Sequence, residues 1–155
     1  MTSELEKTVQ RLADIEDIKQ LKARDAAACD DDYNPDALAP LFTEDAIWDG
    51  GALGYAEGRA GIREFFGASS SLVPFAVHQV SNPLIEFDGD TATGQWFLWQ
   101  PMVLREQALW LSAVYDDNYV RVDGKWLYQH LKLNIRMLTP FEDGPAKTLI
   151  MEVEL

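Results

Sequence analysis

The fold is decided between residues 88 and 138, where three segments follow one another: DGDTATGQWFLWQ (88–100), ALWLSAVYDDNYVRV (108–122) and DGKWLYQHLKLNIRML (123–138). All three contain many of the β-branched and aromatic residues that favour strands. The Asp-Gly pairs that open the first and third segments are typical of tight hairpin turns. We therefore expect each segment to form a strand that pairs antiparallel with the next.

The preceding part of the chain has a helical pattern. Apolar residues at positions 5, 9, 12, 15, 18 and 21 recur every three or four residues, which predicts a long helix from Thr2 or Ser3 to about Cys29. The other expected elements are a short helix after Asn34-Pro35, a strand at 46–48, a helix at 58–66, a strand at 77–87 with Pro83 at an edge or bulge, and after Pro140 either a strand at 148–153 or a contact with a neighbouring subunit.

Helices followed by consecutive antiparallel strands indicate an α+β fold, with the helices packed on one face of the sheet. A long, bulged sheet with N-terminal helices across its concave face closes into a cone-shaped, half-open barrel. The mouth of such a cone is a pocket. The length of 155 residues predicts one domain, residues 1–155.

The chain is acidic, with 13 Lys and Arg residues against 26 Asp and Glu residues and a formal net charge of −13. Surfaces that bind nucleic acid or anionic membranes depend on Lys and Arg, so neither partner is expected. The first residues lack the basic and apolar segments of a signal peptide, and no apolar run approaches the ~18 residues of a membrane span. We therefore expect a cytoplasmic protein.

Few residues are suited to metal or cofactor chemistry. Cys29 is the only cysteine, and His78 and His130 lie too far apart in sequence for a metal-binding motif. The chain also lacks a nucleophile elbow, a phosphate-binding glycine loop and a dinucleotide fingerprint. We therefore expect no metal and no cofactor, and the remaining chemistry is general acid–base catalysis by a histidine and a carboxylate.

Three residues are candidates for that chemistry. His78 starts a strand among apolar residues and is either a core histidine held by a hydrogen bond or a catalytic base. Asp30 ends the first helix, where its charge is unfavourable, and it is either solvated or paired with a cation such as an imidazolium. Asp25 falls on the inward helix face and is either an inward acid or a residue at the rim.

The last strand and the aromatic residues supply candidate pocket residues. Asn134 and Arg136 share one strand face, which is either an exposed polar face or a pair of donors that line the pocket. The residues assigned to substrate binding are Trp48, Tyr55, Trp96, Trp99, Trp110, Tyr115 and Asn134. Aromatic residues of this kind belong either to the core or to the lining of a wide apolar pocket. The stretch 95–99 carries too many aromatics for one strand face, so an outward Trp predicts a subunit interface.

Several motifs together resemble a known family. They are Ile15–Leu21, Asp30 at the helix end, Leu41–Trp48, Gly58–Ile62, His78–Pro83, Asp88–Ala92, Tyr115–Tyr119 and Asp123–Trp126. In order and spacing they resemble the SnoaL-like branch of the nuclear transport factor 2-like superfamily over nearly the whole chain. Within it, the sequence is most similar to the group of scytalone dehydratase, bile acid 7α-dehydratase and hexachlorocyclohexane dehydrochlorinase.

The resemblance implies a cone-shaped α+β barrel and an Asp–His dyad formed by Asp30 and His78. It also implies a catalytic arginine at Arg136. At Asp25 the sequence departs from these relatives, which carry Tyr or Lys there. The resemblance therefore does not identify the group that donates a proton to the leaving hydroxyl. Homo-oligomers are typical of the family, trimers more than dimers.

The function implied is a cofactor-independent dehydratase that eliminates water from a small, apolar, polycyclic carbonyl compound such as a hydroxysteroid, a bile-acid-like compound or a polyketide. An isomerase or polyketide cyclase, or a non-catalytic ligand-binding module, is the alternative on the same scaffold.

Overall fold

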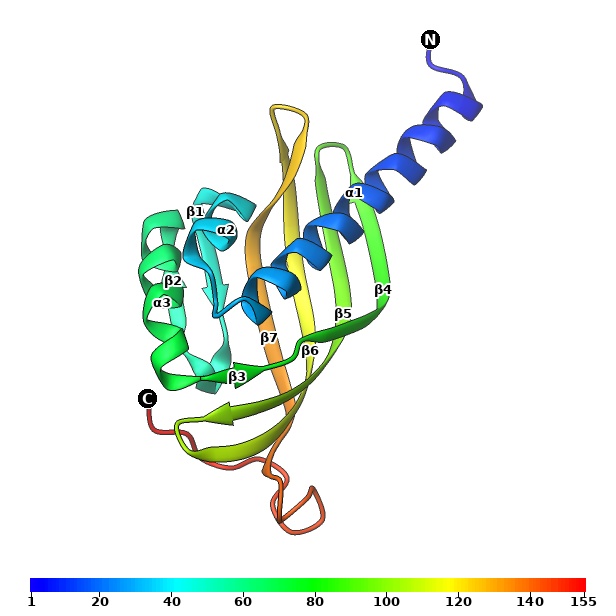
Figure 1. The fold of residues 1–155 in the computed structure, drawn as a ribbon. Coiled ribbons are helices and arrows are strands. Elements are labelled where there is room, and N and C mark those ends of the chain that lie inside the picture. The colour runs from blue at the N-terminus through cyan, green and yellow to red at the C-terminus, as the bar shows by residue number, and fades with distance from the viewer.

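The structure, a computed structural model, describes residues 1–155 and consists of three helices and a curved seven-stranded sheet that does not close (Figure 1). The elements are α1 (Glu4–Asp30), α2 (Pro35–Leu38), β1 (Phe42–Asp49), β2 (Tyr55–Glu57), α3 (Gly58–Leu72), β3 (Phe75–Ala76), β4 (Gln79–Asp88), β5 (Thr91–Leu104), β6 (Gln107–Val122) and β7 (Lys125–Pro140), with 3₁₀ turns at Ala39–Leu41 and Gly51–Leu53. The predicted α+β fold is confirmed.

The strand order is β2-β1-β7-β6-β5-β3, and β4 also pairs with β5. Every pair is antiparallel except β1–β7, which is parallel and joins the first strand to the last. The hairpin between β6 and β7 turns at Asp123 and Gly124, both of which have a positive φ, as expected for an Asp-Gly turn. Pro83 lies where the pairing of β4 with β5 shifts register, so the predicted bulge is present.

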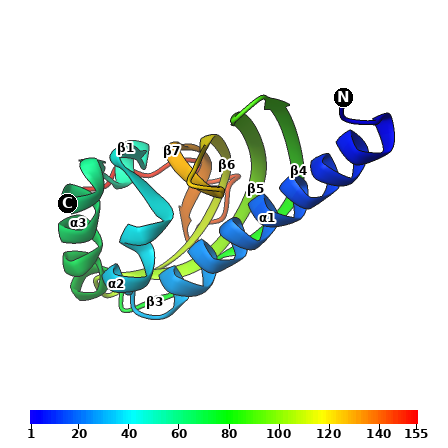
Figure 2. The same ribbon diagram turned by 90° about the horizontal axis from the view of Figure 1, so that it is seen from above.

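Helix α1 begins as the sequence predicts. The Ser3 side chain accepts a hydrogen bond from the backbone of Glu6, and the Glu6 carboxylate accepts one from the backbone of Ser3. This capping box satisfies two backbone donors that a helix N-terminus leaves free. The helix then lies diagonally across the open, concave side of the sheet (Figure 2).

The apolar stripe of α1 is only partly buried. Ile18 and Leu21 are fully buried against the sheet, whereas Leu5, Val9 and Leu12 are exposed. The N-terminal turns of α1 project beyond the edge of the sheet, so these three residues have nothing to pack against (Figure 1). The stripe thus correctly predicts the helix, but the sheet covers only the part of it near the C-terminal end of α1.

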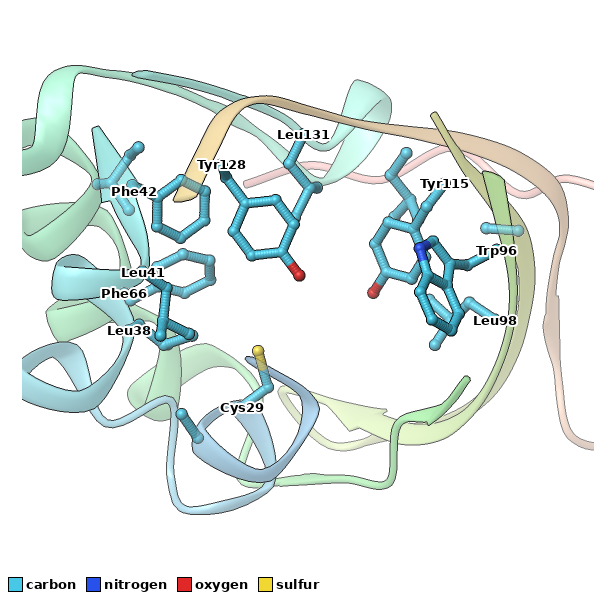
Figure 3. Packing of buried hydrophobic residues seen from close by; sticks show 14 of the residues in the cluster. Cys29, Leu38, Leu41, Phe42, Phe66, Trp96, Leu98, Tyr115, Tyr128 and Leu131 are labelled. Atoms are coloured by element: carbon cyan, nitrogen blue, oxygen red, sulfur yellow. The ribbon is translucent and has the colours of Figure 1, made fainter. Parts of the chain in front are cut away.

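The core lies between the concave face of the sheet and the helices. Alternate residues of β5 and β6 are buried, as expected for strands with one covered face. Tyr115 and Tyr128 point from the sheet toward Cys29 on α1 (Figure 3). No helix combines the length and apolar character needed to cross a membrane.

The segment after Pro140 packs back on the sheet edge. Residue Ile150 forms an isolated parallel bridge with Leu138, and the backbone of Leu138 exchanges hydrogen bonds with Leu149 and Met151. The predicted strand at 148–153 is thus reduced to this single bridge. The chain then continues to Leu155, which reaches the main cavity.

Candidate active site

Asp30 and His78, 48 positions apart in the chain, form a hydrogen-bonded pair. One carboxylate oxygen, Asp30 Oδ1, lies 2.7 Å from His78 Nδ1 and accepts a second hydrogen bond of 2.9 Å from the backbone N–H of His78. Asp30 is the last residue of α1, and His78 lies directly before β4. Two donors on one oxygen offset the unfavourable position of an acid at a helix C-terminus.

The surroundings of His78 hold its ring in one orientation. Its side chain is only 6% exposed, whereas that of Asp30 is 35% exposed. The Tyr33 ring meets the imidazole edge to face, with the ring centroids 5.8 Å apart. Nδ1 is fixed by Asp30, while no group of the protein bonds Nε2. His78 lines the main cavity and Asp30 does not, so the carboxylate lies behind the imidazole as seen from the cavity.

The cavity has a volume of about 300 Å³ and lies between α1, α3 and the concave face of the sheet. Fifteen of its 20 lining residues are hydrophobic. The lining residues with polar or titratable groups are Asp25, Cys29, Tyr33, Glu64, Ser69, His78, Gln100 and Tyr115. Lys and Arg are absent from the lining. The site is therefore an apolar chamber with a few polar groups, which is typical of small-molecule sites.

Tyr33 and Tyr115 present hydroxyl groups to this cavity. The Tyr33 hydroxyl accepts a long hydrogen bond of 3.5 Å from Gln100 Nε2 and donates none to the protein. Burial raises the pKa of both tyrosine hydroxyls. Nearby negative charges raise both pKa values further, and for Tyr115 the main such charge is that of Asp25. Both therefore remain protonated donors throughout the range in which enzymes work.

Asp25 lies inside the barrel, not at its rim. The residue is 6% exposed and lines the cavity. Tyr128 donates a 3.0 Å hydrogen bond to Asp25 Oδ2, and the thiol of Cys29 lies 3.7 Å from Oδ1. Of the two alternatives that the sequence leaves open, the inward acid is the one that the structure adopts.

A buried polar network continues from Asp25 away from the cavity. The ammonium of Lys22 lies 3.8 Å from Asp25 Oδ2 and donates a 2.8 Å hydrogen bond to Asp117 Oδ2. Tyr119 donates to the same oxygen of Asp117 at 2.8 Å and accepts from the indole of Trp96 at 2.9 Å. Burial raises the pKa of Asp117, and the Lys22 ammonium and the Tyr119 hydroxyl partly offset that rise.

Sequence reasoning did not identify this network. The signals were present, since Lys22 falls on the inward face of α1 and Asp117 shares its strand face with Tyr115 and Tyr119. A buried lysine requires a buried acid as its partner. The sequence does not say which of 26 acidic residues that partner is, because the pairing spans 95 positions.

The prediction that Asn134 and Arg136 line the pocket is wrong. Arg136 is exposed and sits at a bulge, where Ser112 pairs with Met137 and Ala113 with Ile135. Asn134 donates a hydrogen bond to Asp116. The inward positions of β7 are taken by Leu131 and Leu133, which line the cavity.

Of the aromatic residues assigned to substrate binding, Trp48 and Tyr115 line the cavity. Trp96 is buried in the network described above, and Tyr55 is exposed and bonds Glu57. Trp99 and Trp110 fall on the outer face of the sheet, because inward and outward positions alternate along a strand. Their ring centroids lie 5.1 Å apart, and Trp110 also packs on Phe141.

The outer aromatic residues agree with the expectation that a Trp of this region points out of the core. Trp110 is 38% and Phe141 62% exposed. A subunit interface at this position, and a trimeric or dimeric state, stay predictions. The structure gathers no group of three or more His, Cys, Asp or Glu side chains that could hold a metal ion.

Comparisons with known proteins agree with this architecture. The SnoaL-like domain family matches residues 10–132. Uncharacterized proteins of Mycobacterium bovis and Mycobacterium tuberculosis are 32% identical over 133 residues, which cover 81% of this chain and 90% of theirs.

Solved structures with the same fold include a type 2 hexachlorocyclohexane dehydrochlorinase, with a TM-score of 0.81 and 25% identity over 86% of this chain and 93% of that chain. A proposed scytalone dehydratase from Novosphingobium aromaticivorans has a TM-score of 0.79 and 23% identity, over 86% of this chain and 91% of that chain. The cone-shaped fold of the nuclear transport factor 2-like superfamily is thus shown for this chain.

Proposed function

The chain belongs to the SnoaL-like domain family, and from this premise we propose that it is a lyase, a cofactor-independent dehydratase that removes water from a hydroxylated carbonyl compound. The observation that carries the proposal is the Asp30–His78 pair at the wall of an apolar cavity. An imidazole held by a carboxylate on one nitrogen has the other nitrogen free to remove a proton.

The first step of the proposed reaction is proton removal by His78 Nε2. The proton comes from a carbon that a carbonyl group makes acidic, directly or through a conjugated alkene. Asp30 holds the Nδ1–H tautomer and stabilises the imidazolium that forms. Histidine suits this role because its unperturbed pKa of about 6.5 lies close to neutral pH.

The negative charge that develops on the carbonyl oxygen needs hydrogen-bond donors. The hydroxyl groups of Tyr33 and Tyr115 supply them, since both line the cavity and are protonated, and neither donates a hydrogen bond to the protein. The electron pair then expels the hydroxyl group from the neighbouring carbon. Protonated His78 returns its proton to that hydroxyl group, so that water leaves and the free base is restored.

The lining of the cavity narrows the substrate class. A ring compound with a mostly uncharged surface fits an apolar chamber of about 300 Å³, whereas a carboxylate inside it finds no Lys or Arg. The polyketides and hydroxysteroids that the sequence resemblance implies are ring compounds with a mostly uncharged surface. The carboxylate of a bile-acid-like compound would have to remain at the mouth, in water.

The proposal is tested by incubating the protein with a panel of neutral hydroxylated ketosteroids and polyketide-type ketones, with products read by mass spectrometry. Loss of 18 mass units from at least one compound, absent with a His78→Ala variant, supports dehydration. A double-bond shift or ring closure at unchanged mass identifies an isomerase or a cyclase instead. Compounds that bind but never change identify a ligand-binding module, the third function that this scaffold supports.

A further inference from the structure

Asp25 is a charged group inside the apolar cavity that the proposed elimination does not use. It lines the same cavity as His78 but forms no hydrogen bond with the Asp30–His78 pair. A carboxylate in such a place is costly unless donors satisfy its oxygens. Its neighbours therefore indicate what it does.

Every hydrogen-bond or ion-pair partner of Asp25 in the protein is a donor. Tyr128 O–H donates to Oδ2 at 3.0 Å, the Cys29 thiol faces Oδ1 at 3.7 Å, and the Lys22 ammonium is 3.8 Å from Oδ2. Burial raises the pKa of both Tyr128 and Cys29, so both keep their protons. Asp25 is thus arranged to accept hydrogen bonds, and this arrangement argues against the role of proton donor that the sequence leaves open.

The two oxygens of Asp25 are not equally satisfied. Oδ2 has a full hydrogen bond and a cation nearby, whereas Oδ1 has only a thiol, which is a weak donor, at a long distance. A carboxylate has about four acceptor positions, so Oδ1 retains room for a strong donor. That donor has to come from whatever fills the cavity, because Asp25 is one of its lining residues.

Lys22 contacts Asp25 on the side that faces away from the cavity. Its side chain is 1% exposed and does not line the cavity, and its ammonium is anchored by Asp117 and lies 3.3 Å from the centroid of the Tyr115 ring. One cation therefore touches the two cavity residues Asp25 and Tyr115 without reaching a ligand itself. A buried lysine in contact only with other protein groups acts through them.

We propose that Asp25 determines substrate specificity by accepting a hydrogen bond from an O–H or N–H group of the substrate, and that Lys22, anchored by Asp117, is the residue that positions it. The inference rests on the proposed function only in that a small uncharged ring compound occupies the cavity. The substrate then carries a donor group, in addition to the hydroxyl that leaves, on the side that faces Asp25.

The test measures binding and needs no turnover. The probes are the 5-, 6- and 7-hydroxy isomers of 1-tetralone, a neutral bicyclic ketone, each paired with its methyl ether, which has the same ring and no donor. Isothermal titration with the wild-type protein is expected to show at least one hydroxy isomer that binds about tenfold or more tightly than its ether, the usual effect of a hydrogen bond to a charged group.

Two variants show whether Asp25 is the residue that causes the preference for the hydroxy isomer. In Asp25→Asn, which keeps the size of the side chain, the preference for the hydroxy isomer should fall at least fivefold. In Glu64→Gln, which alters the other carboxylate of the lining, it should persist. A preference that survives in Asp25→Asn, or is absent from the wild-type protein, overturns the proposal.

The role of Lys22 is tested with Lys22→Met combined with Asp117→Asn, because removal of the lysine alone leaves a buried acid unpaired. We expect this variant to lose most of its preference for the hydroxy isomer over the methyl ether, a ratio in which any change in affinity for the shared ring and ketone cancels. An unchanged preference would limit Lys22 to a structural role. His78→Ala should keep the preference while turnover is lost, which separates this inference from the proposed reaction. If no tetralone binds the wild-type protein, both the inference and the proposed substrate class fail.

Discussion

Asp30 Oδ1 accepts hydrogen bonds from both the ring Nδ1 and the backbone N–H of His78, at 2.7 and 2.9 Å. The backbone contact fixes where residue 78 lies relative to the end of α1, and the ring contact fixes how the imidazole is turned. One carboxylate oxygen therefore sets the position and the orientation of the base together. His78→Ala removes the imidazole, whereas Asp30→Asn keeps an oxygen that can accept the backbone hydrogen bond and removes only the negative charge beside the ring.

Replacing His78 by Ala should lower turnover by roughly 10²–10⁴-fold, the usual contribution of a positioned base. The circular dichroism spectrum should not change, because the imidazole lines a cavity and its loss only enlarges it. His130→Ala is the matched control. His130 is the only other histidine and does not line the cavity, so its variant should keep wild-type turnover. Equal losses in both variants would remove His78 from the mechanism.

Asp30→Asn should retain an oxygen that accepts the backbone N–H of His78 but lose the charge that stabilises an imidazolium. We therefore expect turnover to fall by a smaller factor than in His78→Ala, with the affinity for bound ketones largely unchanged, since Asp30 does not line the cavity. Steady-state kinetics and calorimetric titration measure the two quantities. A variant that loses affinity and keeps turnover contradicts the role assigned to Asp30.

Tyr33→Phe removes one of the two hydroxyl groups proposed to stabilise the developing negative charge. Loss of such a donor costs about 10²–10³-fold in kcat, and KM should change little because the ring remains. The edge contact of the ring with His78 is also retained. Tyr55→Phe is the control, because the Tyr55 side chain is exposed and does not line the cavity, and its variant should keep the wild-type kcat and KM. A rise in KM without a fall in kcat would mean that Tyr33 only binds the ground state.

The sequence predicts the order of elements and the Asp30–His78 pair well, and it predicts the pocket wall poorly. Helix caps, Asp-Gly turns and strand alternation are local signals, so α1 and the hairpins could be read directly. The lining depends on which strand face is concave, and on β7 this is the face of Leu131 and Leu133, so the alternate residues Asn134 and Arg136 point away from the cavity. Periodicity identifies the two faces of a strand but not which of them is covered, so the prediction that Trp99 and Trp110 line the pocket is wrong.

Four of the five tyrosines, Tyr33, Tyr115, Tyr119 and Tyr128, have a pKa raised by burial, which predicts a loss of stability in alkali. Below pH 10 these groups are protonated in both the folded and the unfolded state, so the free energy of unfolding is unaffected. Above pH 10 the unfolded chain releases protons that the folded chain retains, so stability should fall steeply as pH rises.

Urea unfolding between pH 8 and 11 measures this effect, and absorbance at 295 nm follows the tyrosinate. Tyr55 is exposed, and its pKa is raised chiefly by its hydrogen bond to Glu57. It should ionise without unfolding, whereas the other four should ionise together with loss of structure. Smooth ionisation of all five tyrosines in the folded protein would contradict the burial described for them.

Gly94→Ala tests the close packing around the buried network. A Cβ at position 94 would lie 2.7 Å from the ring and 2.9 Å from the hydroxyl of Tyr119, so the tyrosine that links Trp96 to Asp117 has to move. Overpacking of this kind costs about 1–3 kcal/mol of stability. Chemical denaturation should show that loss.

Gly67→Ala provides the contrast. Gly67 lies in α3, and a Cβ added there meets nothing within 4 Å, so the substitution should stabilise the protein by about 0.5–1 kcal/mol through helix propensity alone. Opposite signs in the two variants would locate the strain at Tyr119. Equal and small changes in stability would mean that the side chains of Trp96, Tyr119 and Asp117 shift at little cost. A network that shifts so easily could not fix the position of Lys22 relative to Asp25.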